Sequence, residues 1–177
     1  MKKIVITLLA VTVLLLIYGL AMQEPKKVQV GDTLEAFTLK DQNGNDFNLG
    51  EYLGKHPMVI YFYPKDDTPG CTKEACAFRD SFESFTDMGV KVIGISADSV
   101  KSHKDFVEKY KLPFTLLADT NNVIRKRFGV PKSMLGLLPG RVTYVINKSG
   151  KVVYIFESQL GAEKHISESL KALKQHM

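Results

Sequence analysis

Apolar residues in this chain occur in short continuous runs and in longer stretches with helical spacing. The short runs are typical of buried strands, and apolar residues at every third or fourth position are typical of amphipathic helices. The runs predict strands at residues 58–63, 91–96, 114–118, 142–146 and 152–156. The spaced stretches predict helices at residues 71–88, 100–110 and 124–128, and a last one with Ile166, Leu170 and Leu173 on one face.

An earlier segment predicts a β-hairpin. Residues 37–39 and 46–49 flank the polar turn Gln42-Asn-Gly-Asn45, and two short runs around such a turn favour antiparallel strands. The alternation of strands and helices, followed by two consecutive strands, indicates an α/β domain with a central mixed sheet flanked by helices. No internal repeat or low-complexity tract interrupts the pattern, so we expect a single domain over residues 28–177.

The first 22 residues have a different character. Lys2 and Lys3 precede residues 4–22, an apolar stretch without charge. It is long for the apolar part of a signal peptide and just long enough for a membrane span, and Gly19-Leu-Ala21 offers small residues for cleavage. We therefore expect residues 1–22 to be a signal peptide or an N-terminal membrane anchor. Both alternatives predict export to the periplasmic side of the cell envelope, anchored through residues 4–22 or soluble after cleavage.

Composition, charge and residue spacing exclude several classes of function. Apolar residues make up 45% of the chain, and the net charge of +5 comes from scattered basic residues, so no nucleic-acid footprint is present. The histidines show no metal-ligand spacing, and two cysteines do not complete a zinc site. No glycine-rich loop follows a strand. We therefore expect neither a metal nor a cofactor.

Candidate chemistry follows the first long strand. Pro64 ends that strand because proline cannot donate to a ladder, Thr68 stands at a helix N-cap position, and Cys71 falls in the first helical turn. Unpaired N–H groups and the helix dipole favour an anion there, so we expect Cys71 to be a thiolate at neutral pH. The Thr68 hydroxyl is expected to accept from the backbone near Cys71 and to touch a substrate oxygen. The plain alternatives are a buried apolar cysteine and a threonine that only caps the helix.

Two carboxylates stand near this cysteine in the sequence. Asp66 and Asp67 would disfavour a thiolate, so we expect them to point into solvent and a cation to approach from elsewhere. Arg141, directly before the strand predicted at 142–146, is the candidate, because its guanidinium stays charged. An ordinary surface arginine is the alternative.

The second cysteine, Cys76, follows Cys71 by five positions. On a regular helix this spacing corresponds to about 8.7 Å between Cα atoms, whereas a disulfide needs at most about 7 Å. A bond between them therefore requires the first helical turns to unwind, which favours a reversible redox bond. A fixed structural disulfide stays open as an alternative, since export would place the chain in an oxidising compartment.

The segment from Tyr61 to Cys76 closely resembles the active-site segment of the peroxiredoxins, specifically the Q-type or bacterioferritin-comigratory-protein group. The resemblance continues through residues 112–119, 140–147 and 159–166, so it spans about residues 28–177. It implies a thioredoxin-like fold and a thiol-dependent peroxidase. It also implies that Cys71 is the peroxidatic cysteine and Cys76 the resolving one, and it matches Pro64, Thr68 and Arg141 to the other active-site positions.

The reaction implied by this resemblance begins with attack of the Cys71 thiolate on hydrogen peroxide or an organic hydroperoxide. The resulting sulfenic acid condenses with Cys76, and a thioredoxin-like dithiol reduces the disulfide. We expect the enzyme to act as a monomer. Residues 131–139 form a shorter and more apolar loop than in many Q-type members, so we also expect a preference for organic or lipid peroxides.

Two other functions remain open. A membrane-tethered thiol-disulfide oxidoreductase would share the fold, but such enzymes separate their cysteines by two residues, not four. The other is a non-enzymatic exported domain stabilised by a fixed disulfide.

Overall fold

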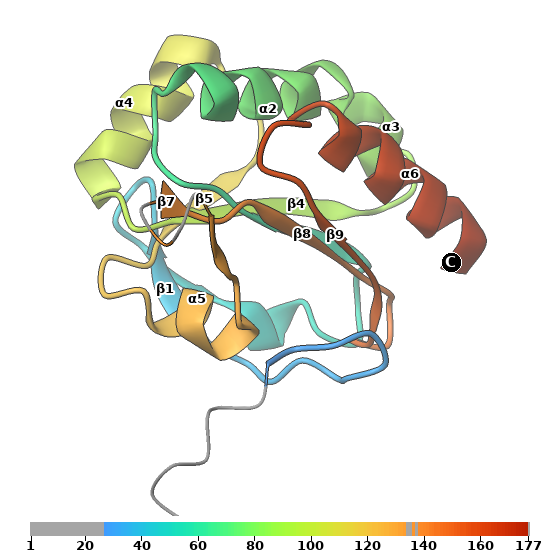
Figure 1. Cartoon of the computed structure of the whole chain (residues 1–177). Coiled ribbons are helices and arrows are strands. Elements are labelled where there is room, and N and C mark those ends of the chain that lie inside the picture. The colour runs from blue at the N-terminus through green and yellow to red at the C-terminus, as the bar shows by residue number, and fades with distance from the viewer. Residues whose placement is uncertain (1–26, 134–135, 137, 177) are drawn as a thin grey trace, which may run out of the picture.

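The computed structural model describes residues 27–133, 136 and 138–176. In these residues a seven-stranded sheet runs through the molecule and carries helices on both faces (Figure 1). The strands are β1 (Thr38–Asp41), β2 (Asp46–Asn48), β3 (Met58–Phe62), β4 (Lys91–Ser96), β5 (Thr115–Ala118), β8 (Val142–Ile146) and β9 (Val152–Glu157). The helices are η1 (Leu49–Glu51), α2 (Pro69–Asp80), α3 (Phe82–Thr86), α4 (Val100–Tyr110), α5 (Val123–Phe128) and α6 (Lys164–His176).

The sheet is mixed, as predicted. Its strand order is β2-β1-β5-β4-β3-β8-β9. β3, β4 and β5 are parallel to one another, β8 and β9 continue the sheet antiparallel beyond β3, and the hairpin β1–β2 pairs antiparallel with β5. The hairpin joins its strands through the turn that the sequence indicates.

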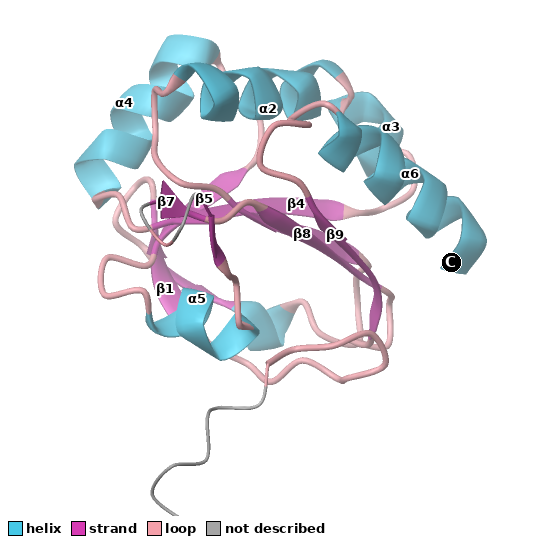
Figure 2. Cartoon of the chain, viewed as in Figure 1, coloured by secondary structure: helices cyan, strands magenta, loops and turns pink. Residues whose placement is uncertain are grey.

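Strand β3 lies in the interior of the sheet between β4 and β8, and every one of its residues is buried. Successive side chains of a strand point to opposite faces. Val59 and Tyr61 join the core that contains Phe78 of α2 and Phe106 of α4, whereas Phe62 joins the core beneath α5. Figure 2 shows the resulting layers, with α2, α3, α4 and α6 on one side of the sheet and α5 on the other.

The helix predicted over residues 71–88 is wrong in one respect. The structure divides it at Ser81, whose ψ of 8° leaves the helical range, into α2 and α3. Ser81 donates its N–H back to the carbonyl of Ala77, which closes α2, and Phe78 and Phe85 on the two sides of the break are both fully buried. A regular apolar spacing in the sequence cannot reveal a break of this kind.

Two further features complete the comparison with the sequence. β6 (Lys132–Ser133) and β7 (Leu138–Pro139) form a separate two-stranded ladder, which is too short to leave a pattern in the sequence. The predicted leader, residues 1–22, lies outside the described residues. Within the part of the chain that is described, no helix has the length and apolar character needed to cross a bilayer.

Candidate active site

Cys71 lies near the junction of β3 and α2. Residues 63–68 connect the buried strand to the helix, which begins at Pro69, a residue that tolerates the first helical position because no N–H is needed there. Cys71 is therefore in the first helical turn, at the positive end of the helix dipole. The residue is only 2% exposed, so the sulfur is largely shielded from solvent.

Arg141 is the cation beside this sulfur. Its Nη2 donates to Cys71 Sγ at 3.3 Å, and its side chain is buried. The backbone before it is tightly held: Gly140 N–H donates to the Pro131 carbonyl at 2.8 Å, and a Cβ on Gly140 would lie 2.2 Å from that oxygen. Burial lowers the pKa of Arg141, but Glu74 and Cys71 outweigh burial and the pKa is raised, so the guanidinium is charged.

Glu74 is a site residue that the sequence reasoning missed. It lies one helical turn after Cys71, is fully buried, and accepts from Arg141 Nη1 through Oε2. Its other oxygen, Oε1, has no hydrogen-bond partner among the described residues. Burial raises the pKa of Glu74 to about 8, although Arg141 acts in the opposite direction. The sequence did contain a signal for Glu74, namely its position three residues after Cys71. Positions three or four apart share one face of a helix, and this face carries Cys71, Glu74 and Phe78.

His165 from α6 contacts the same carboxyl. Its Nδ1 lies 3.7 Å from Glu74 Oε1 and 2.7 Å from Thr143 Oγ1 of β8, while its Nε2 lies 2.9 Å from the Ser158 carbonyl oxygen. Burial lowers the pKa of His165 to about 4, so the ring is neutral at neutral pH. The sequence indicated only that His165 lacks metal-ligand spacing.

Thr68 and Pro64 lie on the connection that carries Cys71. Thr68 occupies the N-cap position as predicted, but the expected capping bond was wrong, because its hydroxyl makes no cap bond and donates to the Lys65 carbonyl at 3.1 Å. The bond consumes the only hydroxyl proton and leaves the oxygen lone pairs free to accept. Pro64 is half-buried just after the end of β3.

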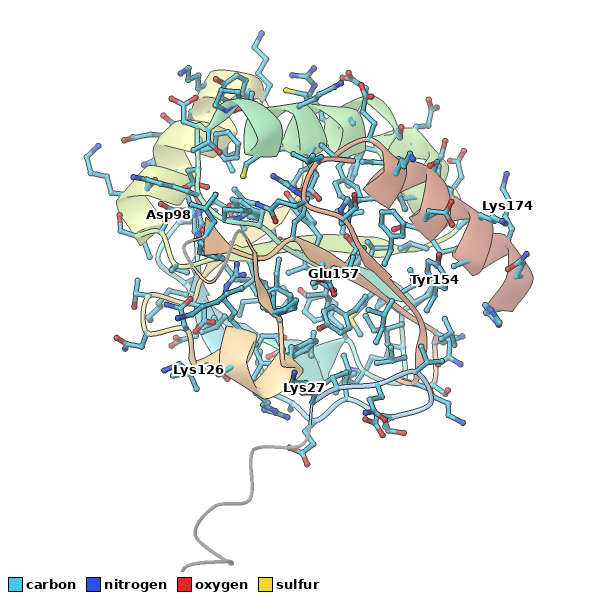
Figure 3. The ribbon with its side chains drawn as sticks, viewed as in Figure 1. Lys27, Asp98, Lys126, Tyr154, Glu157 and Lys174 are labelled. Carbon is cyan, nitrogen blue, oxygen red and sulfur yellow. The ribbon has the colours of Figure 1, made fainter. Side chains whose placement is uncertain are left out.

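The expectation that both aspartates point into solvent was wrong for Asp66. Its side chain is 6% exposed and accepts from Tyr63 Oη at 2.7 Å and Ser102 Oγ at 2.7 Å, and it pairs with His103 Nδ1 at 2.9 Å. The Asp66 N–H donates to Asp98, which lies near the start of α4 in Figure 3. These bonds turn the carboxylate toward α4 and compensate its burial.

Asp67 is exposed, as predicted, but it is paired. Its carboxylate accepts from Lys109 Nζ at 2.6 Å and from Tyr110 Oη at 2.5 Å, both at the end of α4. These hydrogen bonds lower the pKa of Asp67, so it is ionised at neutral pH. Its backbone φ of 53° lies in the left-handed region, which a non-glycine residue adopts only when its surroundings hold it there.

A second buried arginine links the two loops of the site. Arg125 of α5 donates from Nη2 to the Tyr63 carbonyl at 2.6 Å and from Nη1 to the Gly140 carbonyl at 2.9 Å. These carbonyls belong to the residues directly before Pro64 and Arg141. Arg125 therefore fixes the distance between the loop that carries Cys71 and the residue that faces it. The sequence analysis did not identify it.

Cys76 is half-buried on the same helix as Cys71, and both cysteines are free. In a regular helix the pair stands beyond disulfide range. Among the described residues, no group of three or more His, Cys, Asp or Glu side chains could hold a metal ion.

The sheet, the cysteine at a helix start and the arginine that contacts it define a thiol-based enzyme on a thioredoxin-like fold. Comparison with known proteins agrees. The AhpC/TSA family model matches residues 30–155. A chloroplastic peroxiredoxin Q of Sedum lineare is 56% identical over 148 residues, which cover 84% of this chain and 79% of the relative.

Solved structures show the same likeness. The peroxidoxin BcpB of Mycobacterium tuberculosis is 36% identical with a TM-score of 0.77, and the match covers 85% of this chain and 99% of that one. The bacterioferritin comigratory protein of Xanthomonas campestris is 34% identical with a TM-score of 0.73, covering 82% and 99%.

The chain therefore belongs to the AhpC/TSA family and, within it, to the Q-type peroxiredoxins. It is a thiol peroxidase, and the predicted thioredoxin-like fold is confirmed.

The prediction of export to the periplasmic side of the cell envelope was wrong. The matched relatives from Sedum lineare and Arabidopsis thaliana are chloroplastic peroxiredoxins Q, which contradicts a periplasmic location. The predicted membrane contact through residues 4–22 falls outside the described residues and finds no support in the comparisons.

Proposed function

We propose that Cys71 is the nucleophile of this peroxidase and that its thiolate attacks the terminal oxygen of a hydroperoxide. An S–O bond forms, the O–O bond breaks, and the departing oxygen takes the electron pair and then a proton, leaving as water or an alcohol. The observation that carries the proposal is the 3.3 Å contact between Arg141 Nη2 and the buried Cys71 sulfur in the first turn of α2. A fixed guanidinium there stabilises negative charge both on the sulfur and on the departing oxygen.

Thr68 and Pro64 are proposed to position the peroxide. The Thr68 hydroxyl donates its proton to the Lys65 carbonyl, so its oxygen is available to accept a hydrogen bond from the O–H of the substrate. Pro64 offers no N–H that would compete for a peroxide oxygen, and its ring excludes water. Together with Arg141, these groups would leave the reacting oxygen aligned with the sulfur.

Cys76 is proposed to resolve the sulfenic acid. The start of α2 unwinds, the Cys76 thiol attacks the Cys71 sulfur, the S–O bond breaks, and water leaves as the disulfide forms. Both cysteines lie on one helix five positions apart, which on a regular helix corresponds to about 8.7 Å between Cα atoms and supports a bond that forms only when the helix opens. A thioredoxin-like dithiol would then reduce the disulfide and itself become oxidised.

Replacement of each cysteine separately tests this assignment. Cys71→Ser should abolish peroxide consumption, whereas Cys76→Ser should consume about one peroxide per chain and stop at a sulfenic acid, because it lacks the resolving thiol. Rapid-quench kinetics with mass spectrometry follow both products. Peroxide turnover by Cys71→Ser would reject the nucleophile, and a full dithiol-driven cycle by Cys76→Ser would reject the resolving role.

Organic hydroperoxides are the proposed preferred substrates. The bacterioferritin comigratory protein of Xanthomonas campestris has alkyl peroxide reduction activity, and Leu138 of this chain, two residues before Gly140, is 42% exposed and offers apolar contact. We expect a long-chain hydroperoxide to outcompete hydrogen peroxide at equal concentration in a single-turnover competition. A large preference for hydrogen peroxide would contradict this specificity and leave the peroxidase assignment intact.

The geometry does not favour either alternative function. The family match indicates an enzyme, and the two cysteines are not spaced as in a thiol-disulfide oxidoreductase.

A further inference from the structure

The Glu74 carboxyl presents an unusual arrangement for a buried acid. Oε2 accepts from Arg141, but Oε1 is buried without a hydrogen-bond donor among the described residues. An ionised carboxylate has two acceptor oxygens, and leaving one of them unsatisfied away from water costs free energy. A proton on Oε1 removes the charge, and a neutral carboxyl group costs less free energy to bury than an ionised one.

The neighbour of Oε1 also favours a proton there. A backbone carbonyl only accepts, so the 2.9 Å contact with Ser158 requires that His165 Nε2 carries the hydrogen. Nδ1 of the neutral ring is then a bare acceptor, which receives the Thr143 hydroxyl at 2.7 Å. This Nδ1 lone pair lies 3.7 Å from Oε1, so an ionised Oε1 would face a second acceptor.

The charges around the carboxyl lead to the same conclusion. The groups that face it or act on it from the packed elements are Cys71 of α2, Arg141 before β8, neutral His165 of α6 and the un-ionised Tyr61 of β3. The other nearby cation, Arg125, is held by two carbonyls and interacts electrostatically with Asp119 and, without a hydrogen bond, with Cys71. Arg141 is the guanidinium that donates directly to both candidate anions, the Cys71 thiolate and the Glu74 carboxylate, so the two share one contacting charge.

We propose that Glu74 stores the proton that Cys71 gives up, so that the resting site holds a thiolate, one guanidinium and a neutral carboxylic acid. This inference rests on the proposed role of Cys71. It makes Glu74 a positioning residue that controls charge without touching the substrate. The elevated pKa of Glu74, about 8, agrees with the stored proton.

The stored proton balances the reaction. When sulfur takes the terminal oxygen, the thiolate charge disappears and the departing oxygen needs one proton. Arg141 is then free to pair with a Glu74 carboxylate alone, so Glu74 loses its proton as the departing oxygen gains one. Glu74 also lies between the two cysteines, so unwinding of α2 exposes it to water, where a carboxyl group is ionised at neutral pH. The reduced, refolded helix recovers the proton from the Cys71 thiol.

Proton uptake during a single turnover tests the inference. The reduced full chain in weak buffer at pH 7 receives one equivalent of peroxide, and an indicator dye reports the protons taken from solvent by the time the disulfide is complete. The unmodified protein should take up none, because Glu74 supplies the proton, and Glu74→Gln should take up about one per peroxide. Glu163→Gln is the matched control, since it removes an exposed carboxylate that pairs with Lys73 of α2, and it should take up none.

Each other outcome rejects the stored proton. Uptake of one proton by the unmodified protein means that Glu74 does not change its protonation state during turnover, and zero uptake by Glu74→Gln means that Cys71 itself carried the proton as a thiol. Infrared difference spectroscopy of the unmodified protein separates a proton on Glu74 from one on Cys71, and it decides even if Glu74→Gln does not fold. The C=O stretch of a neutral carboxylic acid must be present when reduced and lost on oxidation. Failure to consume peroxide would instead reject the proposed function.

Discussion

At the scale of single residues, the pKa of a side chain in this site depends on burial as much as on its nearest partner. Glu74 contacts a guanidinium, yet burial raises its pKa from 4.5 to about 8. Burial lowers the pKa of His165 from 6.5 to about 4. The two groups therefore make opposite contributions to the pH dependence of folding, because one favours the protonated and the other the unprotonated form.

These shifts predict how the free energy of unfolding depends on pH. The folded protein binds more protons at Glu74 than the unfolded chain between pH 4.5 and about 8, so this contribution falls as pH rises through that range. It binds fewer protons at His165 between about pH 4 and 6.5, so that contribution rises with pH there. Of these two groups, only Glu74 contributes between pH 6.5 and 8.

Urea unfolding of the reduced protein measures the difference. Relative to Glu74→Gln, the unmodified protein should lose up to about 2 kcal/mol between pH 6.5 and 8, since one proton corresponds to about 1.4 kcal/mol per pH unit. Below pH 6.5 Glu74→Gln should lose stability through His165, whereas in the unmodified protein the Glu74 contribution rises as pH falls and offsets that loss. Parallel curves above pH 6.5 would mean that Glu74 is ionised in the folded protein.

At the scale of elements, the end of α4 binds the chain both before and after the part of α2 that contains the two cysteines. Before Cys71, Tyr110 Oη and Lys109 Nζ bind the Asp67 carboxylate. After Cys76, Arg79 Nη1 donates to the Tyr110 carbonyl at 2.8 Å. The segment that contains both cysteines therefore lies between two attachments to one residue of a neighbouring helix, and opening of α2 has to work against them.

Tyr110→Phe should ease that opening. The change removes the hydroxyl bond to Asp67 and keeps the carbonyl bond to Arg79. We expect disulfide formation to become faster by roughly two- to threefold, a modest effect because exposed polar pairs contribute little. The chain has no tryptophan, so rapid quenching, thiol alkylation and mass spectrometry provide the rate.

Tyr154→Phe is the control for this prediction. Tyr154 donates to Glu168 of α6 at 3.0 Å and lies beside α6, away from the start of α2 (Figure 3). Its loss should leave the rate of disulfide formation unchanged. An unchanged or slower rate in Tyr110→Phe would show that the Asp67 attachment does not limit opening.

At the scale of the whole molecule, local patterns predict the framework and non-local contacts complete the site. The strands at 91–96 and 142–146 have the predicted bounds because a buried strand leaves a continuous apolar run. Cys71 and Arg141 were identified together only through the helix start and the family resemblance. Asp66 was wrongly expected in solvent and Arg125 was missed because contacts distant in sequence hold them. Asp98, Ser102 and His103 lie more than 30 positions from Asp66, and the carbonyls of Gly140 and Tyr63 lie 15 or more positions from Arg125. No local spacing encodes such pairs.

The length of α2 has a consequence for how the enzyme works as a molecule. It has 12 residues and begins with Pro69-Gly70, and an isolated helix of that size is marginal in water, so packing against the sheet must maintain it. If the two cysteines form a disulfide as proposed, every catalytic cycle unwinds and re-forms the start of this helix. The electron donor would then do more than break a sulfur bond, since its reaction starts a refolding event, and the intrinsic helix propensity of surface positions such as Lys73 would enter the turnover rate.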